Sequence, residues 1–349
     1  MSDRAAPTAL WITEADVTAL LDMHAAIAAV ERALQAEASG AAQNLLKTYL
    51  QWNSGGTLHA LGGALPASGV VGSKTWAHTA GGATPLLILF DAATGALHAV
   101  IEAFALGQLR TGATAGVATR WLAAEDAGTF ALIGSGKQAM AQVAAVVAVR
   151  PGCTVRVFSP TAAHREALAA RVREVFAVEA SAAASLGEAV DGAAIVTLAT
   201  RARMPLLYAR ALARGAHVNA IGAITPDRAE LAGDVFDRCS VVAADSVPAV
   251  QQLSREFREY YGGRDWAAVV PLSQVVGEPR RRPDTDLTLF KAMGAGLADV
   301  AVGVEVLERA RRAGRGRRLE QPVPAEIDWG RRELRPSAAR CADADERRK

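Results

Sequence analysis

The chain has 349 residues, a formal net charge of +2, and a composition that is 51% hydrophobic and 21% charged. This length favours two domains with sizeable cores, and the composition is typical of a globular protein. The small net charge argues against nucleic acid as the main partner. The three cysteines, Cys153, Cys239 and Cys341, have neither metal-ligand nor paired spacing, so we expect no metal site, no disulfide framework and a reducing compartment.

The first residues carry no apolar segment of the kind found in secretion signals, and no apolar run reaches membrane-spanning length. We therefore expect a cytoplasmic protein that has no membrane partner.

The first part of the chain reads as a pair of helices followed by a sheet. Thr13, with Asp16 three residues later, predicts a helix start, and apolar residues recur at helical spacing over 15–38, with a break near 23–25. Strands are predicted at 48–52, 58–61, 70–76, 85–90 and 96–102. Because 91–95 has the composition of a hairpin turn, this sheet should be mostly antiparallel, and a helix is expected at 106–122.

From residue 129 the pattern changes to alternating strands and helices. Strands are predicted at 130–133, 155–159, 193–199, 217–221 and 240–244, and helices at 139–149, 162–176, 209–214 and 286–311. Such alternation predicts an α/β fold with a doubly wound, parallel sheet. We expect a dinucleotide-binding domain at 125–299, a second α+β domain for substrate and dimerisation from 1–124 with 300–330, and an exposed tail at 331–349.

A short glycine-rich stretch connects the first of these strands to its helix. Gly134 permits the tight turn, Gly136 leaves room for a pyrophosphate beside the backbone, and Ala139 lets the helix pack closely on the strand. A glycine turn in an ordinary βα unit is the alternative, but the order strand, turn, helix, strand favours a dinucleotide fingerprint. The remaining residues expected to contact the cofactor in this turn are Ser135, Lys137 and Gln138.

The residues that follow the strand predicted at 155–159 indicate which nicotinamide cofactor binds. An acid about 20 residues past the glycines would hold a ribose 2′-hydroxyl, but no acid precedes Glu166 here. Ser159 and Thr161 are small hydrogen-bonding residues, and Arg165, with the adjacent His164, adds positive charge. This favours a 2′-phosphate and hence NADPH over NADH, unless Arg165 simply points into solvent.

Two cations in the first part of the chain are candidates for a substrate site. Lys74 lies in an otherwise apolar strand, where it is either exposed, as lysines usually are, or turned into a cleft. Arg110 lies near the start of a helix, where a positive charge does not help the helix, so it is either a surface residue or aimed at an anion.

Several motifs follow one another in an order that carries a resemblance. They are Gly-x-Lys-Thr at 72–75, the hairpin turn at 91–95, Arg-Thr-Gly-Ala at 110–113, Ile-Gly-x-Gly-x-Gln-Ala at 133–139, Val-Asn-Ala-Ile-Gly at 218–222 and Leu-Phe-Lys-Ala-Met-Gly at 289–294. Over about residues 69–302 the chain resembles the ornithine cyclodeaminase/mu-crystallin family. The resemblance implies a substrate domain split around a Rossmann domain and a homodimer formed through the substrate domain. It also implies NAD(P)-linked reduction of imino acids, oxidation of amino acids, or cyclising deamination.

The resemblance also assigns roles to residues. It implies that Lys74 is an active-site lysine and that Arg110 binds the substrate carboxylate. The residues that it implies beside the cofactor are Thr111, Thr200, Asn219, Ile221, Gly222, Lys291 and Gly294.

Two departures from the family pattern bear on the activity. Where cyclodeaminases and related alanine dehydrogenases have an Asp, this chain has Ile224, which can neither bind an amine nor move a proton. Where the family often has an Arg for the carboxylate, this chain offers Lys47 or Asn44. His59, and less specifically His78, lie near enough in the predicted strands to reach the substrate, although a lone histidine is more often structural.

The sequence thus predicts an NADPH-dependent reductase of a C=N bond next to a carboxylate, acting on a small imino or ketimine acid. The alternatives are an ornithine cyclodeaminase-type lyase, an alanine-type amino-acid dehydrogenase, and a non-catalytic protein that binds NADPH and a small acid.

Overall fold

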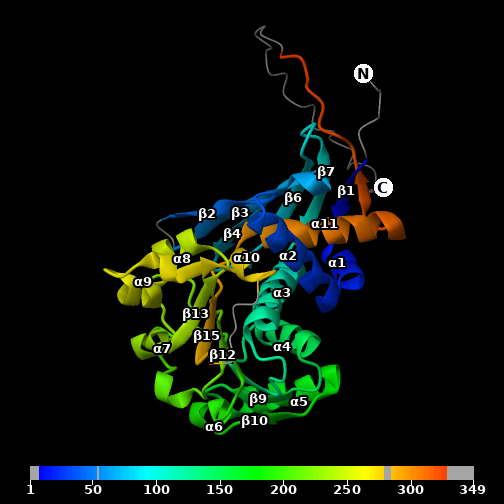
Figure 1. Ribbon diagram of the computed structural model, residues 1–349. Coiled ribbons are helices and arrows are strands. Elements are labelled where there is room, and N and C mark those ends of the chain that lie inside the picture. Colours follow the sequence, from blue (N-terminus) through cyan, green and yellow to red (C-terminus); the bar gives the residue numbers. More distant parts are fainter. Residues whose placement is uncertain (1–7, 53–54, 279–283, 328–349) are drawn as a thin grey trace, which may run out of the picture.

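The computed structural model describes residues 8–52, 55–278 and 284–327. Two eight-stranded sheets form the centre of two lobes, and helix α3 (Phe104–Leu122) runs between the lobes (Figure 1). The tail expected at 331–349 lies outside the described residues.

The sheet of the first lobe is antiparallel at all but one pairing, as predicted. Its strand order is β16-β1-β7-β6-β4-β3-β2, with β5 beside β4, and only β1 and β7 run parallel. In chain order the strands are β1 (Ala9–Ile12), β2 (Gln43–Gln51), β3 (Thr57–Leu65), β4 (Val70–Thr79), β5 (Gly82–Ala83), β6 (Leu86–Asp91), β7 (Leu97–Glu102) and β16 (Arg317–Leu319).

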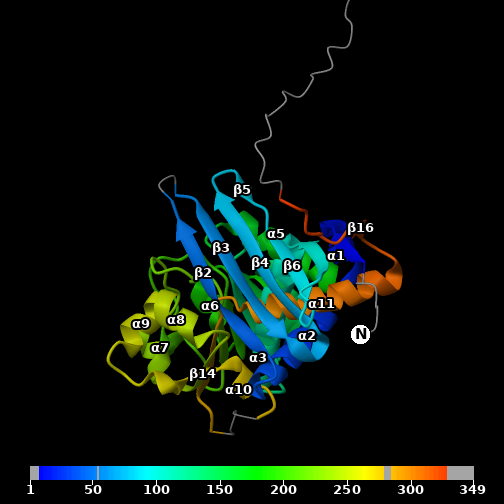
Figure 2. The same ribbon diagram turned by 90° about the horizontal axis from the view of Figure 1, so that it is seen from above.

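Helices cover one face of this sheet. They are α1 (Glu14–Leu20), α2 (Met23–Ala38), α3 and α11 (Gly296–Ala313), and a short 3₁₀ turn, η1 (Pro66–Ser68), precedes β4. The predicted helix start is confirmed, because Thr13 and Asp16 form a reciprocal capping box. Helix α11 packs on β3 and β4, so a segment from the end of the chain completes the core of the first lobe. Figure 2 looks onto the opposite face, where β2, β3 and β4 lie in front of the helices.

The sheet of the second lobe is parallel throughout, with the order β10-β9-β8-β11-β12-β15-β13-β14. Its strands are β8 (Thr129–Ile133), β9 (Thr154–Phe158), β10 (Ala180–Ala182), β11 (Ile195–Leu198), β12 (His217–Ala220), β13 (Cys239–Ala244), β14 (Val269–Pro271) and β15 (Leu287–Lys291). The strand order reverses between β8 and β11, and in a doubly wound sheet a nucleotide binds outside the carboxyl ends of the strands at such a point. The expected α/β fold class with a second α+β lobe is therefore confirmed.

The helices of this lobe are mostly short. They are α4 (Ala139–Val149), α5 (Ala162–Phe176), α6 (Leu186–Val190), α7 (Gly233–Asp237), α8 (Val247–Leu253), α9 (Arg255–Tyr261) and α10 (Leu272–Val275), with 3₁₀ turns η2 (Ala209–Ala211) and η3 (Trp266–Ala268). Helices α4 and α5 have the predicted bounds. No helix in the described part of the chain is both long and apolar enough to cross a membrane.

Two predicted helices are wrong. The segment expected as a helix at 286–311 begins as strand β15, which is buried at all five positions between β12 and β13, and only then becomes α11. Gly294, with a φ of +93°, separates the two elements, because a right-handed helix cannot continue through that conformation. The helix expected at 209–214 is only the single turn η2.

Helix α3 joins the lobes through its small residues. A Cβ added at Gly112 would lie 2.5 Å from the Ala141 carbonyl oxygen in α4, and one added at Gly116 would lie 2.9 Å from Ile27 in α2. This close packing holds α3 between the two sheets, with Arg110 near its first turns.

Candidate active site

Lys74 is buried in the middle of the first sheet, with only 3% of its surface exposed. Lys74 lies on β4, where its register partners on the neighbouring strands are the buried residues Leu61 of β3 and Leu87 of β6. Helix α11 packs over this face. The exposed alternative for Lys74 is therefore wrong. Burying an ammonium group is costly without a partner, so its contacts are informative.

The partner of Lys74 is Asp299, a residue that the sequence analysis did not single out. Asp299 lies on α11 with no exposed surface, and its Oδ1 is 2.5 Å from Lys74 Nζ and 3.2 Å from Arg110 Nε. Its second oxygen, Oδ2, is buried and has no hydrogen-bond partner among the described residues. One carboxylate oxygen therefore holds together the two cations that the sequence selected.

Lys47 and Asp245 extend this group. Asp245 lies just after β13, where it accepts hydrogen bonds of 2.8 Å from the backbone N–H groups of Met293 and Gly294. The Asp245 carboxylate also interacts electrostatically with both Arg110 and Lys47. We call Lys47, Lys74, Arg110, Asp245 and Asp299 the charged cluster; its members come from β2, β4, α3, α11 and the end of β13.

The pKa values of the charged cluster reflect its burial. Burial, together with the charges of Arg110 and Lys47, lowers the pKa of Lys74 to about 8, against the opposing effect of Asp299. Burial and then Arg110 also lower the pKa of Lys47, and burial raises the pKa of Asp245. The pKa of Lys74 is thus closer to neutral pH than that of an ordinary lysine.

A row of three rings lies beside these lysines on the same face of the sheet. Tyr49, His59 and Trp76 are paired in register across β2, β3 and β4, with ring centroids 5.9 Å and 4.7 Å apart and interplanar angles of 22° and 13°. Lys74 Nζ is 5.3 Å from the Trp76 ring centroid. We call these three residues the ring row.

His59 is neutral within the ring row. Burial, followed by the charges of Lys47 and His78, lowers its pKa to about 4. Its Nε2 is 2.8 Å from the Thr57 hydroxyl, whereas its buried Nδ1 has no hydrogen-bond partner among the described residues. The His78 side chain makes no hydrogen bond to the charged cluster within the described residues. The Asn44 side chain instead binds helix α11, because its Oδ1 accepts a hydrogen bond from Leu297 N.

The glycine turn after β8 has the geometry that a dinucleotide requires. Gly134 has a φ of +117°, and a Cβ there would lie 2.4 Å from the Ala199 carbonyl oxygen, so only glycine fits. A Cβ at Gly136 would meet nothing within 4 Å, which leaves open space in front of the N-terminus of α4. Gln138 Oε1 is buried there without a hydrogen-bond partner among the described residues. Free N–H groups at the start of an 11-residue helix suit a pyrophosphate, so the residues present fit the cofactor.

The loop after β9 contains no carboxylate. Ser159 is 4% exposed, and its hydroxyl donates to the Thr161 carbonyl oxygen. Arg165 Nη1 donates to the carbonyl oxygens of Ser159 and Pro160, at 3.1 Å and 3.4 Å. The guanidinium is therefore anchored over this loop rather than extended into solvent.

Glu230 connects two of the residues expected near the cofactor, although the sequence analysis did not identify it. It has no exposed surface and accepts from the N–H and hydroxyl of Thr200 and from the N–H groups of Gly222 and Ala223. Burial raises its pKa. Glu230 thus fixes the ends of β11 and β12 relative to each other, at the edge where a nucleotide binds.

Lys291 is fully buried at the end of β15. Its ammonium donates to the Ala223 carbonyl oxygen at 2.6 Å and to Glu256 Oε1 at 2.8 Å. Glu256 in turn accepts from the N–H groups of Glu230 and Leu231. Lys291 therefore supports the loop beside the predicted nicotinamide site through other residues.

The remaining residues expected near the cofactor differ in their surroundings. Asn219 is buried inside β12 and donates to Thr119 and Thr197. Thr111 donates within α3 to the Gly107 carbonyl oxygen, and Ile221 is 5% exposed. At Gly294 a Cβ would lie 3.4 Å from Arg110 Nη1, so the guanidinium lies against the backbone at the carboxyl end of the second sheet.

Ile224, in the loop after β12, is half-buried and packs against the apolar core of the second lobe. The acid that cyclodeaminases have there is replaced by a hydrocarbon side chain. In this chain, the buried carboxylates of the site come from Asp245 and Asp299 instead.

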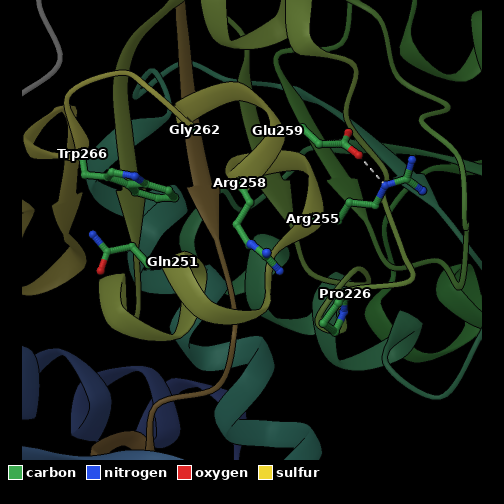
Figure 3. Close-up of a pocket in the computed structure, with 7 residues that line it drawn as sticks. All are labelled: Pro226, Gln251, Arg255, Arg258, Glu259, Gly262 and Trp266. Carbon is green, nitrogen blue, oxygen red and sulfur yellow. Dashed lines mark hydrogen bonds and ion pairs between the residues drawn. The ribbon is translucent and has the colours of Figure 1, made fainter.

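A separate hollow of about 620 Å³ lies over α8 and α9 (Figure 3). In Figure 3, Arg258 projects between Gln251 and Pro226, and Trp266 lies on the same side as Gln251. Arg255 and Glu259 pair with each other at 2.7 Å. None of the residues in the charged cluster or the ring row lines this hollow.

Comparison with known proteins agrees with this arrangement. The family model described as "Ornithine cyclodeaminase/mu-crystallin family" matches residues 9–314. The chain is 32% identical over 242 residues to a Delta(1)-pyrroline-2-carboxylate reductase of Bacillus cereus, a match that covers 67% of this chain and 74% of the relative.

Two solved structures have the same fold over most of the chain. The Delta(1)-pyrroline-2-carboxylate reductase of Thermococcus litoralis, in complex with NADH and L-proline, superposes with a TM-score of 0.82 at 26% identity, covering 89% of this chain and 100% of that one. An archaeal alanine dehydrogenase dimer with bound NAD has a TM-score of 0.82 at 28% identity, covering 89% of this chain and 99% of that one. The chain belongs to the ornithine cyclodeaminase/mu-crystallin family.

Proposed function

We propose that this protein is an NADPH-dependent reductase that converts a C=N bond next to a carboxylate into an amino acid. One observation carries the proposal: Lys74 and Arg110, joined by the buried Asp299, adjoin the carboxyl edge of the second sheet, where Arg110 lies against Gly294. Substrate and nicotinamide would therefore meet between the two lobes. The reductase activity named for the relatives agrees with this assignment.

Each residue of the site has a role in this proposal. Arg110 and Lys47 bind the substrate carboxylate, and Lys74 gives a proton to the nitrogen of the imine. Protonation makes the imine carbon a better hydride acceptor. The nicotinamide, when bound, supplies the hydride. The pKa of Lys74, about 8, suits a proton donor that works near neutral pH.

Support for NADPH comes from the loop after β9. A 2′-phosphate carries negative charge, and this loop presents the Arg165 guanidinium and no carboxylate before Glu166. The relatives with known complexes are described with NADH and NAD, so the preference proposed here is a property of this chain's own loop.

A reductase is favoured over an ornithine cyclodeaminase by Ile224. The loop offers a hydrocarbon where a cyclodeaminase needs an acid, and the carboxylate of Asp299 is already paired with Lys74 and Arg110. Ornithine should therefore release no ammonia in the absence of added cofactor, whereas a cyclodeaminase would release it.

We also propose a homodimer formed through the open face of the first sheet. Leu50 and Leu58 are paired in register there and are 63% and 45% exposed, and Leu45 on the same strand as Leu50 is 55% exposed. Such contiguous exposed apolar residues are typical of an interface. Leu50→Glu should yield monomers in light scattering after size exclusion; an unchanged mass would exclude this face.

The proposed function is tested by following NADPH absorbance with Δ1-pyrroline-2-carboxylate, Δ1-piperideine-2-carboxylate, and keto acids mixed with methylamine. Oxidation of NADPH that depends on the imine is expected. If NADPH binds and no imine in the panel is reduced, the protein is a binder and the reductase assignment is wrong.

A further inference from the structure

We propose that the site selects imino acids that have a single carboxylate and an uncharged, ring-bearing side chain, and that the ring row is the surface on which that side chain lies. This inference rests on the proposed function and names the substrate class of the same site. It excludes dicarboxylic imino acids and substrates with a side-chain ammonium group.

The charge of the site favours a substrate with one carboxylate. The charged cluster contains the cations Lys47, Lys74 and Arg110 and the anions Asp245 and Asp299, so with all five ionised its net charge is 3 − 2 = +1. One substrate carboxylate balances this charge. A second substrate carboxylate would be buried without a cation to pair with. A substrate ammonium group would lie close to the cations of the cluster. Both arrangements are unfavourable away from water.

The ring row lies next to the lysines of the charged cluster. On alternate residues of one strand, Lys74 and Trp76 point to the same face of the sheet, and Lys74 Nζ is 5.3 Å from the Trp76 ring centroid. The charge of Lys47 contributes to lowering the pKa of His59, the next ring in the row. A side chain that extends along the sheet, away from a carboxylate held by Arg110 and Lys47 and past Lys74, therefore reaches the rings first.

The ring row is uncharged and only partly covered. Tyr49 is 48% exposed, Trp76 is half-buried, and His59 is neutral near pH 7. His59 Nδ1, buried and without a hydrogen-bond partner among the described residues, is available to a polar atom of the ligand. Planar rings packed on such a surface gain the contacts that aromatic pairs favour.

The test measures binding of unreactive carboxylates, which needs no turnover. Isothermal titration calorimetry compares acetate, indole-2-carboxylate, succinate and 5-aminopentanoate on the full chain, with and without NADPH. We expect indole-2-carboxylate to bind roughly tenfold or more tightly than acetate, since one aromatic contact is worth about that factor. Succinate and 5-aminopentanoate should bind no better than acetate.

Variants of the ring row show whether it causes this preference. Trp76→Leu should lower the affinity for indole-2-carboxylate to near that for acetate, and Trp76→Phe, which keeps a ring, should restore much of it. Trp266→Leu is the matched control, because Trp266 is a half-buried tryptophan on the second lobe and should leave all four affinities unchanged.

Two results would overturn the inference: tighter binding of succinate or 5-aminopentanoate than of indole-2-carboxylate, or full retention of the preference in Trp76→Leu. A failure of the proposed function is distinguishable, because it would appear as absent imine reduction while these binding preferences persist.

Discussion

Lys74 Nζ lies 2.5 Å from Asp299 Oδ1, although the two residues are 225 positions apart in the sequence. The pair joins strand β4 to helix α11, and Arg110 contacts the same oxygen. This one carboxylate allows two cations to be buried side by side, in a position where a substrate carboxylate and a proton donor are both needed.

Replacing Lys74 removes the proposed proton donor to the imine nitrogen. Lys74→Met keeps the length and apolar packing of the side chain and should lower kcat by roughly 100-fold or more, the usual worth of a general acid. NADPH binding, followed by its fluorescence, should be unchanged. A variant with nearly full kcat would show that the proton comes from elsewhere.

Replacing Asp299 tests how the protonation of Lys74 is set. Asp299 raises the pKa of Lys74, while burial, Arg110 and Lys47 lower it to about 8, so Asp299→Asn should lower this pKa further. Because activity requires the protonated amine, activity is lost as the pH rises through this pKa. The alkaline limb of the kcat/KM profile should therefore move to lower pH in Asp299→Asn. An unmoved limb in an active variant would show that Lys74 is not the titrating group.

The glycine turn offers a matched pair of variants. Gly134→Ala places a Cβ 2.4 Å from a carbonyl oxygen at a φ of +117°, so it should lower the melting temperature of the protein. Gly136→Ala meets no protein atom and should fold normally, yet it should weaken NADPH binding roughly tenfold or more because the Cβ occupies the space proposed for the pyrophosphate. Equal effects of the two variants on folding and binding would contradict this reading of the turn.

The cofactor preference is tested at the loop after β9. Arg165→Ala should raise the KM for NADPH several-fold and leave the KM for NADH little changed, since only NADPH has the 2′-phosphate. Ser159→Asp should shift the preference further toward NADH by repelling that phosphate. A preference for NADH in the unmodified protein would contradict the proposal directly.

Much of the fold follows from local pattern. Helices α4 and α5 were predictable because each follows a predicted strand in the alternating pattern, and they run over 11 and 15 residues. Strand β15 was not, because it is only five residues long, four residues separate it from helix α11, and burial on both faces removes the alternation that identifies a strand.

The site was predictable in part, for a physical reason. Lys74 and Arg110 lie in motifs whose order carries the family resemblance, but nothing near them in the sequence indicates Asp299. An acid among the apolar residues of α11 was the available signal, because a charge on a buried helix face needs a partner. Which partner it has depends on how α11 returns to the first sheet, and that is a property of the tertiary fold.

The central claim, reduction of a C=N bond by hydride delivered between the two lobes, is tested most directly by isotope transfer. NADPH carrying deuterium at C4 of the nicotinamide is incubated with Δ1-pyrroline-2-carboxylate and the protein, and the product is analysed by mass spectrometry. The account predicts proline with one deuterium at Cα, formed by the unmodified protein and at most in traces by Lys74→Met. Absence of labelled proline from a preparation that binds NADPH would contradict it.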